Sequence, residues 1–368
     1  MKTQQIEEGK VKLTVPKGYK LDSSMPVFYN TIQVLNRDIS IILLNTIQKQ
    51  NNKPVRILDL LSASGVRGLR IKAEVPNVDV TINDYKKDAY KLMKKNAKLN
   101  KLDITIENKP ANVLLTELKT YDYLDIDPFG TPVPFLDSAI KRLSPRAIFA
   151  VTATDMSALC GAASKACLRK YGSKPLRSEF MHETAVRILI KKCQQTAAQY
   201  DVSLNPIFSH SSNHYIRVYF QKANSAKKAD DVLQQHGWIL YCSGCCWRDT
   251  TTTPLKDKDI CPKCKAKLDY AGPVWLGELW DQKLVKRMTK YAQKDTFSDK
   301  TKKLLNQISE EMSIKSVGFY DMHWLAKKRK SPEICKIDKT IQEIKNNRHK
   351  ASRTHFRLTG IRTNCDLV

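Results

Sequence analysis

The sequence has no long apolar run, and none of its hydrophobic stretches approaches the roughly 18 residues that a helix needs to cross a bilayer. Its first residues, Met1–Gln5, are polar and contain no apolar core of the kind that marks a signal peptide. No internal repeat is visible. We therefore expect a cytoplasmic chain without a membrane-spanning segment.

Acidic residues are scarce. There are 37 Asp and Glu against 63 Lys and Arg, a net charge of +26 over 368 residues. Such an excess favours a polyanionic partner, and nucleic acid is a more common one than a membrane surface. The basic residues concentrate after Gln282, where they are either a solvated helix face or contacts to phosphates. At 42% hydrophobic residues the chain is not disordered, and its length favours two domains.

Hydrophobic patterns alternate between strand and helix in the first half of the chain. After a basic β-hairpin within residues 1–30 and a helix over 31–48, we expect strands at 55–61, 78–83, 103–107, 121–126 and 147–152, with helices at 66–74, 86–100, 111–118 and 134–142 between them. Such alternation predicts a parallel α/β sheet with helices on both faces. A helix over 178–200 and an antiparallel strand pair at 202–210 and 214–221 close this domain. The small polar stretch 223–230 is a candidate linker, so we expect a catalytic domain over residues 1–222 and a smaller α+β domain over 223–368.

The loop from Ser62 to Gly68 lies between a predicted strand and a helix, where backbone N–H groups can approach a ligand closely. It lacks the glycine triplet of dinucleotide sites, and its hydroxyl groups suit a carboxylate or a ribose better than a pyrophosphate. Asp84 ends the next strand, where an acid accepts hydrogen bonds from ribose hydroxyls. S-adenosylmethionine has a ribose and a carboxylate but no phosphate, so we assign Ser62, Gly65 and Asp84 to that cofactor. The alternative is an ordinary tight turn in which Asp84 caps the following helix.

The segment Asp127-Pro128-Phe129-Gly130 follows a buried strand. An exocyclic amine is a poor nucleophile, and its methylation needs acceptors for its N–H bonds and its proton. Asp127 offers a carboxylate, Pro128 a carbonyl held by its ring, and Phe129 a face for stacking on an extruded base. The alternative is that Asp127-Pro128 merely begins a loop.

The cysteines include two C-x2-C pairs, Cys242/Cys245 and Cys261/Cys264, separated by 15 residues. This spacing is typical of a four-cysteine zinc site within about residues 237–270, and a site with four protein ligands is structural. Cys246 could replace Cys245 as a ligand, and four ordinary buried thiols are the alternative. The histidines show no metal-like pairing and are interpreted as structural or RNA-contacting.

The chain resembles the tRNA guanine-26 N2-dimethyltransferases, especially those of archaea, over most of its length. The resemblance is carried by 28–30, 36–38, 59–68, 127–130, 152–156, 177–187 and the tail 354–363. It implies that Arg37, Arg67 and Asp84 contact S-adenosylmethionine, that Asp127 is the catalytic acid/base, and that Phe28 and Phe129 flank the target base. Arg37 alone would read as a snorkelling side chain at the edge of a core.

One position departs from the family pattern. Pro110 stands where the family has an acid before the pair Ala111-Asn112. Because proline offers neither a carboxylate nor an N–H, we expect Asn112 or a backbone group at Ala111 to meet the adenine amine instead.

Together these features predict a Rossmann-like methyltransferase that uses S-adenosylmethionine and structural zinc, acts on tRNA and has no evident obligate protein partner. Two alternatives remain. One is a degenerate methyltransferase fold that only binds RNA. The other is a DNA amino-methyltransferase, since those enzymes also use an Asp/Asn-Pro-aromatic tetrad.

Overall fold

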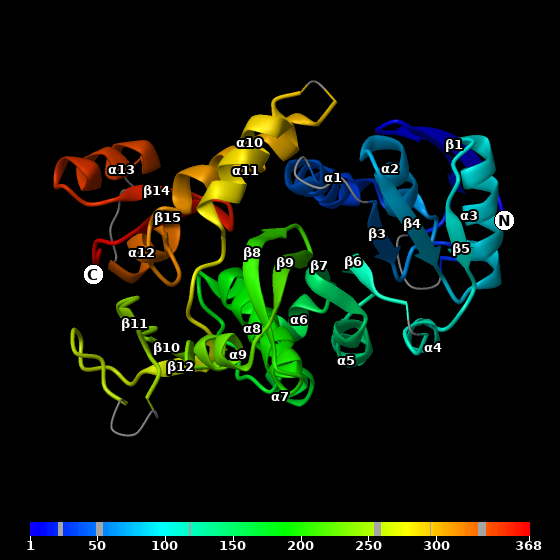
Figure 1. Cartoon of the computed structure of the whole chain (residues 1–368). Coiled ribbons are helices and arrows are strands. Elements are labelled where there is room, and N and C mark those ends of the chain that lie inside the picture. The colour runs from blue at the N-terminus through cyan, green and yellow to red at the C-terminus, as the bar shows by residue number, and fades with distance from the viewer. Residues whose placement is uncertain (21–24, 49–53, 118, 254–258, 295, 330–335) are drawn as a thin grey trace. The chain divides into compact units, whose positions relative to one another are not determined.

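The protein is represented by a computed structural model that describes residues 1–20, 25–48, 54–117, 119–253, 259–294, 296–329 and 336–368. The chain divides into two compact units, and Figure 1 labels helices and strands along the whole chain. The first comprises Met1–Thr152, Tyr219–Ala223 and Lys286–Lys303, and the second comprises Ala153–Val218, Asn224–Val285 and Leu304–Val368. Neither unit is one continuous stretch, and the domain ranges 1–222 and 223–368 remain sequence-based predictions.

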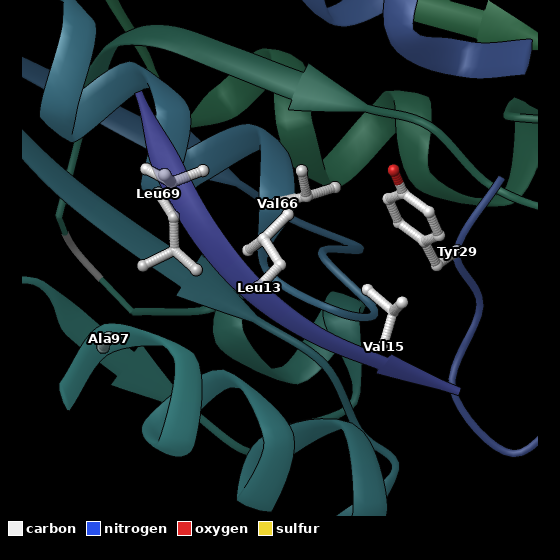
Figure 2. Packing of buried hydrophobic residues seen from close by; sticks show 7 residues of the cluster. Leu13, Val15, Tyr29, Val66, Leu69 and Ala97 are labelled. Carbon is white, nitrogen blue, oxygen red and sulfur yellow. The ribbon is translucent and has the colours of Figure 1, made fainter. Parts of the chain in front are cut away.

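The first unit begins with the predicted hairpin, in which β1 (Thr3–Glu8) pairs antiparallel with β2 (Val11–Pro16). Apolar residues of β2 pack on the helices that follow. Figure 2 shows Leu13 and Val15 lying among Tyr29, Val66, Leu69 and Ala97. The side-chain amide of Asn96 exchanges hydrogen bonds with both backbone groups of Thr14, at 2.7 and 3.1 Å. The hairpin is therefore fixed to the helices by packing and by hydrogen bonds.

The predicted alternation of strands and helices is confirmed. The elements are η1 (Thr31–Gln33), α1 (Val34–Gln48), β3 (Val55–Asp59), α2 (Val66–Glu74), β4 (Val78–Asn83), α3 (Lys87–Leu99), β5 (Thr105–Glu107), α4 (Ala111–Leu114), β6 (Tyr121–Ile126), α5 (Val133–Lys141) and β7 (Leu143–Ala153). Strands β3, β4, β5, β6 and β7 pair in parallel. With β8 (Val202–Ser212) and β9 (Tyr215–Asn224) they form a seven-stranded sheet in the order β5-β4-β3-β6-β7-β9-β8.

The second unit contains helices that the sequence pattern did not predict, α6 (Met156–Leu159) and α7 (Ser164–Tyr171), before the expected long helix α8 (Met181–Ala198). The candidate linker 223–230 begins at the boundary between the two units, after Ala223, but most of it is helical. Those residues enter α9 (Ala226–Leu233), whose first turn is capped by Ser225 accepting a hydrogen bond from the backbone N–H of Lys228 at 3.3 Å. Ala229 and Val232 are buried on one face, so a stretch that reads as small and polar is an amphipathic helix.

Two small sheets complete the second unit. Strands β10 (His236–Tyr241), β11 (Arg248–Thr251) and β12 (Asp269–Trp275) pair in the order β11-β10-β12, and β13 (Tyr320–Asp321), β14 (Ala351–Thr354) and β15 (Arg357–Thr363) in the order β13-β15-β14. The remaining helices are α10 (Gln282–Ala292), α11 (Asp299–Glu311), α12 (Met322–Arg329) and α13 (Ile337–Asn346). Among the described residues, no helix has the length and hydropathy needed to span a membrane.

A buried ion-pair network joins distant parts of the second unit. Arg362 on β15 contacts Glu183 on α8 and Glu311 on α11, each at 2.7 Å. Glu311 also pairs with His355, and Glu183 with Arg187 at 2.8 Å. Burial raises the pKa of Glu183, but the guanidinium groups of Arg362 and Arg187 outweigh it and lower that pKa to about 2. The C-terminal tail is thus an integral part of this unit's core.

Candidate active site

The carboxyl ends of β3 and β6 bring three acids to one edge of the sheet. Asp59 ends β3 and lies opposite Asp125 in the parallel register, while Asp127 follows β6 by one residue. Strand side chains alternate between faces, so Asp125 and Asp127 point the same way. The side chain of Asp125 is fully buried, whereas that of Asp127 remains 19% exposed. Asp127 is therefore the acid of the pair that a substrate can reach.

Arg67, in the first turn of α2, contacts the acids at this edge of the sheet. Its guanidinium forms a short ion pair with Asp127 and lies 3.6 Å from Asp125. It also donates hydrogen bonds to the side-chain oxygen of Asn36 at 3.0 Å and to the hydroxyl of Ser40 at 2.9 Å. The amide of Asn36 reaches Asp127 at 3.4 Å. Helix α1 thus fixes the guanidinium, which in turn fixes the Asp127 carboxylate.

The site carries excess negative charge when its acids are ionised, because one guanidinium lies among three carboxylates. Burial raises the pKa of Asp59 to about 7; Arg67 opposes this rise, and the charge of Asp125 adds to it. Within the described residues, one carboxylate oxygen of Asp59 is buried without a hydrogen-bond partner. Such a cluster favours a cationic ligand, whose charge would offset the mutual repulsion of the acids.

The loop from Ser62 to Gly68 turns sharply between β3 and α2. Ala63 and Gly65 adopt left-handed backbone angles, with φ of 48° and 78°, and Gly65 is the N-cap of α2. A Cβ on Gly68 would lie 2.1 Å from Ile82, so only glycine allows α2 to approach β4 this closely. The Ser62 hydroxyl donates to the Asp59 carbonyl at 2.7 Å, and the buried Ser64 hydroxyl has no partner within the described parts of the chain.

Asp84 supports the loop from the neighbouring strand. Its carboxylate accepts hydrogen bonds from the backbone N–H of Ala63 at 3.0 Å and of Lys86 at 2.9 Å. Burial raises its pKa, which those two N–H groups counter. These contacts match the turn-and-cap alternative and also place the acid beside the loop from Ser62 to Gly68, so the ribose role of Asp84 remains a prediction.

The two predicted aromatic residues lie together. The rings of Phe28 and Phe129 meet edge to face, with centroids 4.4 Å apart and an interplanar angle of 73°. Phe129 is 54% exposed although it is large and apolar, and it follows Asp127 by two residues. An exposed aromatic face beside a reachable carboxylate suits a flat heterocyclic substrate.

Two of the other predicted cofactor residues, Arg37 and Asn112, bond to groups of the protein in this structure. Arg37 forms two hydrogen bonds of 2.6 Å with Glu8 of the hairpin, and its side chain is only 6% exposed. The side-chain amide of Asn112 donates to the Pro134 carbonyl at 3.2 Å, and Ala111 is buried at the start of α4. The cofactor roles of these residues remain predictions, and Arg37 in this structure ties α1 to the hairpin.

Sequence reasoning missed Asn36, Ser40, Asp59 and Asp125. Asn36 and Ser40 are spaced by four residues and interrupt the apolar pattern of α1, which was the available signal. Asp125 stands two residues before Asp127 on the same face of its strand, and Asp59 ends the strand that leads into the glycine loop. A charged residue at the end of a buried strand is the pattern that both acids share.

The cysteine cluster fits a tetrahedral metal. The Sγ atoms of Cys242, Cys245, Cys261 and Cys264 lie within 4.8 Å of one another, with pairs at 3.3 and 3.7 Å. Zinc–sulfur bonds of roughly 2.3 Å imply tetrahedron edges of about 3.8 Å. Cys246 lies outside the cluster, with a left-handed φ of 70° and its thiol beside Tyr241. This geometry favours Cys245 over Cys246 as the fourth ligand.

A sequence model described as N2,N2-dimethylguanosine tRNA methyltransferase matches residues 9–368. The chain belongs to this family. One relative, the tRNA (guanine(26)-N(2))-dimethyltransferase of Methanobrevibacter smithii, is 40% identical and covers 100% of this chain and 95% of its own. The tRNA (guanine(26)-N(2)/guanine(27)-N(2))-dimethyltransferase of Aquifex aeolicus is 39% identical over 98% of this chain and 92% of its own.

A solved member of the family has the same fold. The structure of Trm1 from Pyrococcus horikoshii with S-adenosyl-L-methionine superimposes with a TM-score of 0.86 at 35% identity, covering 99% of this chain and 97% of that one. The predicted family and the predicted Rossmann-like methyltransferase fold are therefore confirmed.

Proposed function

We propose that this protein transfers methyl groups from S-adenosylmethionine to the exocyclic N2 of guanine 26 in tRNA, giving N2,N2-dimethylguanosine. The observation that carries this proposal is the Asp127 carboxylate, fixed by Arg67 and Asn36 beside the exposed ring of Phe129. Family membership gives the substrate class, and this arrangement gives the chemistry.

S-adenosylmethionine, when bound, supplies an electrophilic methyl group on a positively charged sulfur. The acids Asp59, Asp125 and Asp127 favour that charge, and the Ser64 hydroxyl and the start of α2 offer donors to the rest of the cofactor. The buried Asp59 oxygen and Ser64 hydroxyl, which have no partner among the described residues, are the groups that a ligand would satisfy.

Asp127 would accept a hydrogen bond from the guanine amine and then its proton as the new N–C bond forms. Arg67 orients the carboxylate and stabilises its charge before the transfer. The Pro128 carbonyl is a second acceptor for the amine, and Phe129 supplies the surface on which the base stacks. Because the Phe28 and Phe129 rings touch, the base either stacks on the outer face of Phe129 or separates the two rings.

The basic second half of the chain would hold the tRNA in the cytoplasm, where tRNA is abundant. The end of α13 and the turn after it expose Lys345, Arg348 and Lys350. Three exposed basic residues within six positions support contacts to phosphates.

The test is mass spectrometry of nucleosides from tRNA incubated with the protein and S-adenosylmethionine. N2,N2-dimethylguanosine should appear with wild-type tRNA and disappear when guanine 26 is replaced by adenine. A degenerate RNA-binding fold would yield no methylated nucleoside, and a DNA enzyme would label duplex DNA in preference to tRNA. Either of those results would overturn the proposal.

A further inference from the structure

A cavity of about 360 Å³ lies within the second unit and outside the candidate active site. Its wall is formed by the start of β11, by the loop that precedes β13, and by the C-terminal residues 363–366. Pockets for small organic ligands begin at roughly 300 Å³. The cavity is thus large enough for one nucleotide-sized group.

Aromatic and cationic side chains line this cavity. Trp247 and Tyr320 contribute rings, and the guanidinium of Arg248 lies 3.8 Å from the centroid of the Tyr320 ring. Arg248 is held in place because its Nε donates to the Val317 carbonyl at 3.1 Å. Unpaired RNA bases are commonly bound by stacking on aromatic rings and on guanidinium planes.

The wall also contains polar atoms that could bind a ligand. The Nη1 of Arg248 and the hydroxyl of Ser316 are buried and have no hydrogen-bond partner in the described part of the chain. Lys315 is exposed at the same wall and pairs there with Glu278 at 3.3 Å. Asp366 already accepts a hydrogen bond from the Tyr320 hydroxyl at 3.1 Å and pairs with Lys263 at 3.2 Å. The exposed carboxylate of Asp249 is therefore the acceptor for base N–H groups. A base needs both donors and acceptors along its edge, and this wall offers both.

The cysteine cluster positions one side of the cavity. The carbonyl of Trp247 accepts a hydrogen bond of 2.8 Å from the backbone N–H of Cys242, and its N–H lies against the thiol of Cys245. The aromatic ring is therefore carried by a residue whose backbone belongs to the first C-x2-C turn. A folded cysteine turn is a condition for this wall to exist.

We propose that this cavity binds one unpaired nucleotide of the tRNA other than the methylated guanine. The base stacks against Trp247 and the Arg248–Tyr320 pair, and Lys315 meets the adjoining phosphate. This inference rests on the proposed function, because it takes tRNA as the ligand. The cavity would be a second site at which the protein recognises a tRNA nucleotide, and the cysteine cluster would support that site.

The test compares tRNA dissociation constants of Trp247→Ala, Trp247→Phe and Lys315→Ala. Trp324→Ala is the aromatic control and Lys141→Ala the charge control, since Trp324 and Lys141 lie outside this cavity and Lys141 forms an exposed pair with Asp137 on α5. Loss of one base stack should weaken binding by about 5- to 150-fold for Trp247→Ala. Trp247→Phe should recover most of that loss, and the salt dependence of both variants should equal that of the wild type. Lys315→Ala should instead reduce the salt slope by about 1.

Chemical footprinting identifies the nucleotide. One unpaired position of the tRNA should be protected by the wild type and by Trp247→Phe, and become reactive with Trp247→Ala. The inference is overturned if Trp247→Ala binds tRNA within twofold of Trp324→Ala, or if no protection is lost. Failure of the proposed function looks different, because the wild type would then form no dimethylguanosine whatever happens at this cavity.

Discussion

Replacing Asp127 by asparagine isolates its acid/base role. The substitution keeps the shape of the side chain and an oxygen for the Asn36 amide, now 3.4 Å away, but removes the group that takes the amine proton. Loss of one general base lowers a rate by about 10²- to 10⁴-fold, equivalent to about 3–5 kcal/mol of transition-state stabilisation. We expect this drop in the single-turnover rate at saturating tRNA and S-adenosylmethionine.

The fold should survive the Asp127→Asn change. The guanidinium of Arg67 keeps three other contacts in the variant: the Asp125 carboxylate at 3.6 Å, the Asn36 side-chain oxygen at 3.0 Å and the Ser40 hydroxyl at 2.9 Å. The lost ion pair is partly exposed, and its removal also relieves repulsion among the acids. We therefore expect the free energy of unfolding to fall by at most about 2 kcal/mol, between the values typical of surface and buried pairs.

The matched control is Asp137→Asn, which makes the same chemical change in an exposed pair with Lys141 on α5. It should leave the rate within a factor of two, because α5 supplies no group to the acid cluster described above. A turnover of Asp127→Asn within threefold of wild type, with S-adenosylmethionine bound normally, would remove Asp127 from the mechanism.

Three further predictions concern charge and metal. Burial raises the pKa of Asp59 from 3.8 to about 7, so its ionisation lowers the stability of the folded state as pH rises between those values. The ionised carboxylate would attract the positively charged sulfur of S-adenosylmethionine, so the affinity measured by calorimetry should increase as pH passes about 7. Asp59→Asn should abolish that dependence. The pKa of Glu183 is lowered from 4.5 to about 2, so the stability that its ionised form contributes is complete above pH 4.5 and is lost as pH falls from 4.5 toward 2. In urea unfolding at neutral pH, Glu183→Gln should lower the free energy of unfolding by about 3–5 kcal/mol, because Arg362 loses a buried partner. The urea midpoint of this variant should depend less on pH than that of the wild type. The protein should contain about one zinc per chain, and Cys242→Ser and Cys264→Ser should each lose it and lower the melting temperature; zinc-free wild-type protein of full stability would contradict this.

The regular parts of the fold were predictable because they depend on local patterns. Helix α2 and strands β4 and β6 occupy the predicted residues, since each combines a clear hydrophobic period with flanking Gly, Pro or Asp. The cysteine cluster was predictable for the same reason, because its ligand spacing is written in the sequence. The choice of Cys245 over Cys246 was not, since it depends on the left-handed turn at Cys246.

Partner choice among the charged residues could not be predicted from sequence. Arg37 and Arg67 both resemble cofactor ligands, yet Arg37 pairs with Glu8 and Arg67 with Asp127. Glu8 reaches Arg37 only because the N-terminal hairpin packs on α2 and α3, a contact between segments far apart in the chain. The sequence therefore identifies which residues carry charge, and the tertiary structure decides which partners they take.

The C-terminal tail shows how a family motif can be structural. The block from Thr354 to Thr363 carried part of the resemblance and lies in the basic half, where phosphate contacts were one of two open interpretations. Instead Arg362 is buried between Glu183 and Glu311, and His355 pairs with Glu311. Deleting the tail would remove partners from two buried acids and disrupt the second unit, so a lost affinity for tRNA would not reveal a phosphate contact. Exposed lysines such as Lys345 on α13 can be neutralised without that cost, and they are the residues on which the salt dependence of tRNA binding should be tested.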